Sequence, residues 1–260
     1  MPEFTKHAPG TFSWAELSTT DIDAAVKLYP DLFGWEVQEQ PLPAEAGGGS
    51  YYLFAKNGKP VAGGSTQMQQ EKDMGVPPHW NMYVAVEDAE QTAKKAESLG
   101  GTILAPAFDV MDLGRMAVFS DPTGAVLSVW ETKTMPGAAV LREDGAMGWN
   151  EVMTNDSDKA IAFYTELFDW TTESFPGQEG YTLFKKGDQS TAGCMQVQTP
   201  GQPPAWMLHF QSSNVDQVVE KVKTAGGQVL MGPEDIQGVG RVAVTTDPQG
   251  AFFGAYTPSE

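Results

Sequence analysis

The sequence predicts an α+β fold built as a tandem repeat of two units, each made of two βαβββ modules. Three observations support this prediction. A long pattern of aromatic, acidic and glycine residues occurs twice along the 260 residues. Within each copy, short stretches with strand character alternate with segments of helical periodicity. Each copy also closes with the turn sequence Asp-Pro-x-Gly, at 121–124 and again at 247–250.

The duplication is clearest at residues that the fold alone does not require to match. Trp14 and Glu16 return 135 positions later as Trp149 and Glu151. Other matched pairs are Asp21 and Asp156, Tyr29 and Tyr164, Trp35 and Trp170, Tyr51 and Tyr181, Gly63 and Gly193, and Trp80 and Trp206. The spacing falls from 135 to 130 and then to 126 across two loops, where insertions are tolerated. The sequence therefore predicts two similar sites, or one working site and one relic.

The first module begins with a predicted strand at 11–17 and a predicted helix at 22–32. Asp21 is of the residue type favoured at a helix N-cap, apolar residues follow at helical spacing, and Gly34 ends the helix. Three further strands are predicted at 35–38, 51–56 and 59–67, the last two joined by the hairpin signal Asn57-Gly58.

The second module repeats this order. A strand is predicted at 79–86, followed by a helix at 88–99 that stops at Gly100-Gly101. The remaining strands are predicted at 102–105, 114–120 and 125–132. The second unit repeats both modules at 147–198 and 205–257. We therefore expect a first repeat at 1–132, a linker at 133–146 and a second repeat at 147–260.

The composition restricts the partners. The formal net charge is −18, and such a field repels phosphate backbones, which argues against nucleic-acid binding. The chain has a single cysteine, Cys194, so an intrachain disulfide is excluded, and we expect this cysteine to be a small buried residue. No apolar run approaches the roughly 20 residues of a membrane helix, and residues 1–10 lack a signal-peptide pattern. We expect a cytoplasmic protein, monomer or homodimer, with a small-molecule ligand and no nucleic-acid or membrane partner.

The order of these motifs resembles a known family. The duplicated module with its Asp-Pro-x-Gly turn, and the opening segment 10–21 with the letters GTFSWAELSTTD, are similar to the vicinal oxygen chelate superfamily. That group includes glyoxalase I, bleomycin-resistance proteins and extradiol dioxygenases, and the likeness to its two-repeat, glyoxalase-like branch spans nearly the whole chain. The resemblance implies a curled mixed sheet in each repeat, with helices outside and a ligand on the concave face.

The resemblance also implies positions for metal ligands, and this chain departs from the pattern there. The first position carries Trp14 or Trp149, and the second falls, to within one residue, on Met82 or Leu208. The third carries Ser128 or Gly254, and the strands expected to supply the fourth ligand offer glutamine but no carboxylate. These side chains are poor ligands for zinc, nickel, iron or manganese. We therefore predict no metal and no cofactor, and we expect structural or surface roles for His7, His79 and His209.

The carboxylates beside the two tryptophans are the candidate catalytic residues. By strand alternation, Trp14 points the same way as Glu16, and Trp149 the same way as Glu151. Each pair has two interpretations. The tryptophan is a core residue whose neighbouring glutamate bonds to the backbone or to an arginine, or the pair lines a ligand pocket in which a partly buried glutamate acts as a base.

Further residues are candidates for ligand binding. Trp80 and Trp206 either plug the junction between modules or cap a pocket, and Trp130 and Tyr256 occupy matching places on the last strand of each repeat. Arg115 and Arg241 either anchor an anionic ligand group or pair with nearby aspartates, namely Asp109, Asp112 and Asp235. Met82, Ser128 and Leu208 complete the candidate set, together with Trp14 and Trp149.

An aromatic cavity with few polar groups suits an apolar or aromatic ligand. The sequence therefore favours a metal-independent binding protein of the glyoxalase/bleomycin-resistance type. Two alternatives remain open. One is a glyoxalase-like lyase or isomerase that uses Glu16 or Glu151 as base, and the other is an interaction scaffold whose clefts are filled by its own side chains.

Overall fold

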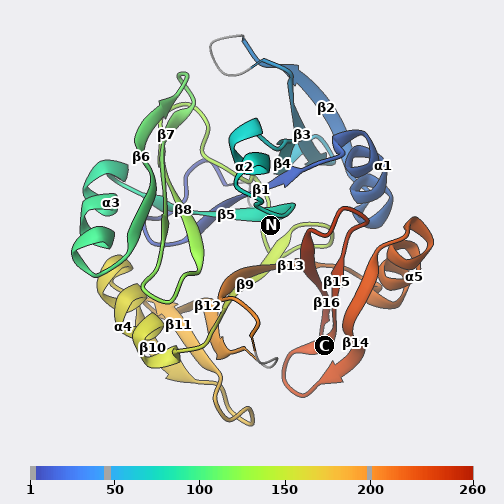
Figure 1. The fold of residues 1–260 in the computed structure, drawn as a ribbon. Coiled ribbons are helices and arrows are strands. Elements are labelled where there is room, and N and C mark those ends of the chain that lie inside the picture. Colours follow the sequence, from blue (N-terminus) through green and yellow to red (C-terminus); the bar gives the residue numbers. More distant parts are fainter. Residues whose placement is uncertain (1–3, 44–47, 198–200, 260) are drawn as a thin grey trace.

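A computed structural model describes residues 4–43, 48–197 and 201–259, so the predicted ends at 1, 198 and 260 lie outside the described residues. The first repeat forms an eight-stranded sheet in the order β2-β3-β4-β1-β5-β8-β7-β6 (Figure 1). Its elements are β1 (Phe12–Thr19), α1 (Ile22–Phe33), β2 (Glu36–Pro41), β3 (Ser50–Lys56), β4 (Lys59–Thr66), α2 (Gln69–Asp73), β5 (His79–Val86), α3 (Ala89–Ser98), β6 (Thr102–Val110), β7 (Gly114–Ser120) and β8 (Val126–Thr132).

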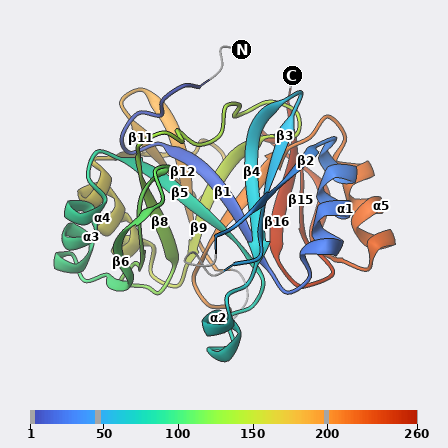
Figure 2. The same cartoon turned by 90° about the horizontal axis from the view of Figure 1, so that it is seen from above.

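The second repeat forms an equivalent sheet in the order β10-β11-β12-β9-β13-β16-β15-β14. Its elements are β9 (Met147–Thr154), α4 (Ser157–Phe168), β10 (Thr171–Ser174), β11 (Thr182–Lys186), β12 (Gln189–Gln196), β13 (Ala205–Gln211), α5 (Val215–Ala225), β14 (Gln228–Ile236), β15 (Gly240–Thr246) and β16 (Phe252–Pro258). Both sheets are mixed and the longer helices lie around them (Figures 1 and 2), which confirms the predicted fold class.

Two modules join within each sheet along an antiparallel pair of strands. In the first sheet β1 pairs antiparallel with β5, while β1 pairs parallel with β4 and β5 pairs parallel with β8. The register of β1 shifts between Phe12 and Trp14, and β9 has an equivalent shift opposite His209 and Phe210. Because an irregularity of this kind changes which side chains share a face, it bears on the site.

The helices begin and end where the sequence indicates. Asp21 accepts a hydrogen bond from the Ala24 amide, at 3.0 Å, and Gly34 ends α1 in a left-handed conformation with φ 68°. The structure adds the short helix α2, which the sequence did not predict. It also extends β6 to Val110, because two register shifts against β7 allow the strand to continue past Pro106.

The two repeats share one core. Helix α1 packs against α5 of the other repeat, and α3 packs against α4, so each pair combines both halves of the chain (Figures 1 and 2). Aromatic rings cross the boundary, with Phe33 and Phe210 at a centroid distance of 4.8 Å. Tyr29 donates a hydrogen bond to Asp247 Oδ2, at 3.0 Å, across the same boundary. The repeats are therefore bound into one hydrophobic cluster.

Among the described residues, no helix combines the length and the apolar character required to cross a lipid bilayer.

Candidate functional site

The candidate site lies on the face of each sheet that the helices do not cover, here called the inner face. On β1, Ala15 and Leu17 belong to the core that the helices cover, whereas Trp14 belongs to a separate cluster with Tyr83 and Trp130. The alternation predicted for β1 holds here, because Glu16 is linked to Trp14 through hydrogen bonds on this face.

A Trp–Tyr–Glu chain of hydrogen bonds occurs on both inner faces. In the first, the Trp14 indole donates to the Tyr51 hydroxyl at 3.1 Å, and that hydroxyl donates to Glu16 Oε2 at 3.1 Å. In the second, the corresponding distances are 2.8 Å from Trp149 to Tyr181 and 2.7 Å from Tyr181 to Glu151. The tyrosines were not among the predicted site residues, although their recurrence 130 positions apart was the signal that could have found them.

A glycine lies under each of these tyrosines. A Cβ atom on Gly63 would lie 1.9 Å from the Tyr51 hydroxyl oxygen, and one on Gly193 would lie 2.0 Å from the Tyr181 hydroxyl oxygen. The repeated glycines therefore leave the space through which each hydroxyl reaches its glutamate.

The first inner face is covered by the chain that follows β8. The Ala138 amide donates to the Ser13 carbonyl at 2.7 Å, and the Trp130 indole donates to the Met135 carbonyl at 2.8 Å. His7 adds a contact at 2.9 Å between Nε2 and the Ala138 carbonyl. Trp14 and Trp130 are consequently 3% and 6% exposed. This inner face is packed with the protein's own side chains.

Glu16 remains partly exposed at this face and has a perturbed acidity. Burial among protein atoms raises the pKa of its carboxyl to about 7, against a smaller lowering by the Tyr51 hydrogen bond, and the charge of Glu71 on α2 raises it further. The carboxyl is therefore close to half protonated at neutral pH.

This acidity predicts a specific pH dependence of stability. Because the folded state holds the Glu16 proton more tightly than the unfolded state, stability falls as pH rises from about 4.5 to about 7. Glu16→Gln is expected to remove this fall. At alkaline pH its free energy of unfolding should exceed that of the wild type by about 1–2 kcal/mol, a value reduced because solvent partly screens the carboxylate. Thermal unfolding across pH 5–8 measures it. Glu36→Gln, on the exposed β2, is the control for loss of one charge, and identical curves for both variants would contradict the prediction.

The second inner face holds a buried hydrogen-bonded pair, Glu151 and His209. His209 Nε2 lies 3.0 Å from Glu151 Oε1, and Tyr181 bonds the other carboxylate oxygen. Burial by itself raises the pKa of the Glu151 carboxyl, but the charge and hydrogen bonds of His209 and Tyr181 outweigh it, so the pKa is lowered. Trp149, Tyr181 and Tyr256 around the pair remain partly exposed, in contrast to the covered Trp14 and Trp130.

Four predicted ligand-binding residues belong to the core and not to an inner face. Trp80 donates to the Tyr29 hydroxyl at 3.0 Å, and Trp206 donates to the Tyr164 hydroxyl at 2.7 Å, as the plug interpretation expected. Met82 and Leu208 are buried in the same core. Met82 is the register partner of the core residue Ala15, and Leu208 is the partner of Asn150. The neighbours of Met82 and Leu208 face inward instead, because they pair with the inward residues of β1 and β9. The inward residues are Asn81 and Tyr83 in β5, and Met207 and His209 in β13.

His209 lies on the inner face, where its buried ring is hydrogen-bonded to Glu151. Opposite it, a Cβ on Gly254 would lie 1.9 Å from His209 Nδ1. In the first repeat, the matching Ser128 is buried and exchanges hydrogen bonds with Asn81 at 2.9 and 3.1 Å.

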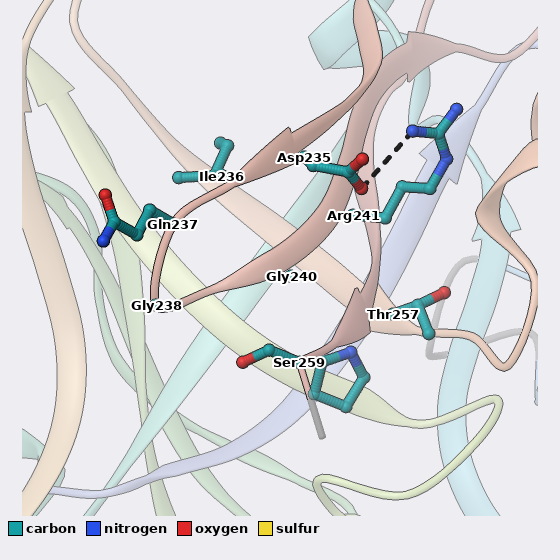
Figure 3. A pocket seen from close by; sticks show the side chains of 9 residues that line it. Asp235, Ile236, Gln237, Gly238, Gly240, Arg241, Thr257 and Ser259 are labelled. Carbon is teal, nitrogen blue, oxygen red and sulfur yellow. Dashed lines mark hydrogen bonds and ion pairs between the residues drawn. The ribbon is translucent and has the colours of Figure 1, made fainter.

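The two arginines form ion pairs on the surface. Arg115 lies 3.2 Å from Glu90 and 3.6 Å from Asp109. Arg241 lies 2.7 Å from Asp216 and 3.4 Å from Asp235, and the latter pair borders a hollow of about 490 Å³ at the turn between β14 and β15 (Figure 3). Both guanidinium groups have carboxylate partners, so the two arginines pair with nearby acidic residues, as the second of the two interpretations expected. A second hollow, of about 500 Å³, lies at the turn before β11 and includes Tyr181 in its lining.

The inner faces do not fit the metal centre that the resemblance implies. Within the described ranges, no three or more His, Cys, Asp or Glu side chains are grouped to hold a metal ion. The second face offers one imidazole and one carboxylate, which bond to each other, and the first offers one carboxylate beside a neutral amide and hydroxyl groups. A protein metal centre takes three or four protein ligands, so neither set suffices.

Comparison with known proteins places the chain in a family. The family model for the Glyoxalase/Bleomycin resistance protein/Dioxygenase superfamily matches residues 11–129 and 146–253. The chain therefore belongs to that superfamily, with one match in each repeat.

Among curated relatives, the "Putative glyoxylase CFP32" of Mycobacterium tuberculosis (strain CDC 1551 / Oshkosh) is 40% identical over 100% of this chain and 99% of that protein. The anthracycline biosynthesis protein DauV of Streptomyces sp. (strain C5) is 33% identical over 96% of this chain and 94% of that protein.

Solved structures share the fold at low identity. The Mn(II)-bound glyoxalase from Novosphingobium aromaticivorans matches with a TM-score of 0.65 and 12% identity, covering 97% of this chain and 83% of that chain. The 2,3-dioxygenase LapB from Pseudomonas sp. KL28 matches with a TM-score of 0.62 and 13% identity, covering 100% and 94%.

Proposed function

We propose that the protein binds a small aromatic molecule on the inner face of its second sheet, without a resident metal ion. The observation that carries the proposal is the ring of partly exposed aromatic side chains, Trp149, Tyr181 and Tyr256, around the buried pair of Glu151 and His209. Aromatic walls supply contact area for a planar ligand, and the few polar groups fix its orientation.

The first inner face supports a different role. Its aromatic residues are packed against Ala138, with Met135 and Leu141 beside them. The scaffold alternative expected such a filled face, and we assign that role to the first repeat alone. Binding is therefore assigned to the second repeat, where the matching aromatic side chains remain accessible.

The names of the relatives agree with an aromatic ligand. Two of them, DauV and DnrV, are named as anthracycline biosynthesis proteins, and the chain matches them over nearly their whole length, at 33% and 32% identity. Anthracyclines are polycyclic aromatic compounds. A planar fused-ring compound is thus the first ligand class to test.

Calorimetric titration of the full chain with 2-methoxyanthraquinone, a planar neutral probe, tests the proposal. Trp149→Leu removes a partly exposed aromatic wall and is expected to weaken binding at least tenfold. Trp14→Leu changes the matching residue of the covered face, so it is expected to change affinity less than about twofold as long as circular dichroism shows it folded. Binding that depends on Trp14, or that disappears after treatment with a metal chelator, would contradict the proposal.

One observation favours a second candidate, a lyase or isomerase with a carboxylate base. The pKa of Glu16, raised to about 7, suits removal of a proton from an acidic C–H bond near neutral pH. Exchange of substrate C–H for deuterium, followed by NMR on α-ketoaldehydes and their thiol adducts, tests this candidate. Exchange that is present in the wild type and lost in Glu16→Gln would support it, whereas its absence in both leaves binding as the function.

A further inference from the structure

We propose that Arg142 anchors a carboxylate group on the ring-bearing ligand of the second inner face. This inference rests on the proposed binding function and deepens it, because it names the charge of the ligand and the residue that recognises that charge. The aromatic walls of Trp149, Tyr181 and Tyr256 are left to hold the ring itself.

Arg142 differs in its partners from the other two arginines of the chain. Arg115 and Arg241 both form ion pairs with carboxylates. Within the described ranges, the exposed Arg142 guanidinium has no carboxylate at ion-pair distance, and its Nη2 donates to the Ser190 backbone carbonyl at 2.5 Å. A guanidinium is always charged and has five N–H donors, so after one bond to a neutral carbonyl its charge and a pair of donors remain for an anion.

The first repeat shows what lies at the matching place when the chain itself fills it. There, the Ala139 amide donates to the Pro60 carbonyl at 2.7 Å, as part of the linker that covers the first inner face. Pro60 and Ser190 are matched residues, 130 positions apart. In the second repeat the Arg142 guanidinium takes the carbonyl that the linker takes in the first, so it lies on the same side of the sheet as that linker.

A second, independent contact places Arg142 beside the aromatic wall. The Tyr256 hydroxyl lies over Gly148 near the start of β9, because a Cβ on that glycine would collide with it. Burial raises the pKa of Tyr256, and the positive charge of Arg142 opposes this rise, as a guanidinium close to the phenol does. The cation therefore lies at the end of the inner face where Tyr256 and Trp149 are partly exposed.

The residue that matches Arg142 in the first repeat has a different role. It is His7, 135 positions earlier, which is buried and whose Nε2 contacts the Ala138 carbonyl of the linker at 2.9 Å. The two segments are equivalent in space as well, because the carbonyls of Gly10 and Gly145 each accept an indole N–H from the other repeat. The same position thus holds a ring that fixes a cover in the first repeat and an exposed cation in the second.

The backbone at Arg142 is held in an uncommon conformation. Its φ is 56°, in the left-handed region that side chains other than glycine rarely adopt, and its amide donates to the Met147 carbonyl at 2.9 Å. Backbone angles of this kind cluster at ligand-binding sites. Because the turn holds the main chain and Ser190 holds the guanidinium, the side chain has less freedom to lose when it binds an anion.

The charge of the whole protein determines the sign of the expected effect. The formal net charge is −18, so the long-range field opposes the entry of an anion. Glu151, on the same face, is buried with its two oxygens bonded to Tyr181 and His209. Without a local anchor, an aromatic carboxylate should bind more weakly than a neutral compound of the same shape. Tighter binding of the carboxylate therefore requires a cation at the site.

Calorimetric titration of the full-length protein with anthraquinone-2-carboxylate and anthraquinone-2-carboxamide tests the inference. The two probes share their ring system and shape, and only the carboxylate is charged near neutral pH. We expect the carboxylate to bind about tenfold more tightly than the amide. This preference should shrink when the salt concentration rises from about 0.05 M to about 0.5 M, because the guanidinium is exposed and salt screens its charge.

Variants locate the effect. Arg142→Gln is expected to remove the preference for the carboxylate and to change the affinity for the amide by less than about twofold. Arg142→Lys keeps the charge but loses the fork of two donors, so it is expected to keep a smaller preference. Lys159→Gln removes one positive charge from the exposed surface of α4 in the same repeat, and it should leave the preference unchanged.

The outcomes separate the two proposals. If neither probe binds and 2-methoxyanthraquinone does not bind either, the proposed function fails together with the inference. If the amide binds and the carboxylate binds no more tightly, the inference is overturned and the binding function stands. A preference for the carboxylate that survives in Arg142→Gln also overturns the inference, because another group then holds the anion.

Discussion

Replacing Asp247 with alanine is expected to lower the free energy of unfolding by about 3 kcal/mol, because it removes several buried hydrogen bonds at once. Asp247 is 2% exposed, and its Oδ1 accepts from the amides of Gln249 and Ala251 at 3.0 and 2.9 Å. Its Oδ2 accepts the Tyr29 hydroxyl of the other repeat at 3.0 Å. The substitution therefore damages both the Asp-Pro-x-Gly turn and the contact that joins the repeats.

Chemical denaturation of matched variants checks this expectation. Asp247→Asn keeps an acceptor oxygen and is expected to cost less than the alanine variant. Asp188→Ala, at an exposed turn between β11 and β12, is the control and should change stability by less than about 0.5 kcal/mol. Tyr29→Phe removes only the hydrogen bond between the repeats and is expected to lower the free energy of unfolding by about 1 kcal/mol. Equal stability of Asp247→Ala and the control would show that this turn does not join the repeats.

Gly254→Ala is expected to destabilise the protein by about 2–4 kcal/mol and to release His209 from Glu151. The added Cβ would lie 1.9 Å from Nδ1 of a ring that is buried and held by Glu151, so the ring has to move. Glu151 then keeps only the Tyr181 hydrogen bond. Gly148→Ala is the matched control, because its Cβ would meet the hydroxyl end of the partly exposed Tyr256, which can move into solvent.

The pH dependence of the stability loss in Gly254→Ala shows whether release of His209 from Glu151 causes that loss. In the wild type, the lowered pKa of Glu151 contributes stability above the unfolded pKa near 4.5, and this contribution is lost as pH falls through the folded pKa. Without His209, burial raises that pKa, and stability instead falls as pH increases above 4.5. Unfolding measured at about pH 5 and pH 7.5 should therefore show a larger loss for the variant at the higher pH. An equal loss at both values would indicate simple overpacking.

Local signals in the sequence determined the fold. The recurrence of Trp14 and Glu16 as Trp149 and Glu151 predicted two units, and Asp21 and Gly34 located a helix within one or two residues. These predictions succeed because capping, turn formation and strand alternation depend on neighbouring residues. The alternation also placed each tryptophan on the same face as its glutamate, as the hydrogen bonds through Tyr51 and Tyr181 require.

The tertiary structure decided which faces those residues share with others. The pairing of distant strands places Met82 opposite Ala15 and Leu208 opposite Asn150, away from the inner faces. It places Tyr83 opposite Trp14 and His209 opposite Trp149, and no local pattern records this register. Likewise, the pairing of His209 with Glu151 joins residues 58 positions apart, and the covering of Trp14 depends on the path of the chain after β8. Composition and spacing determined the framework, whereas contacts between distant strands determined that the two copies differ.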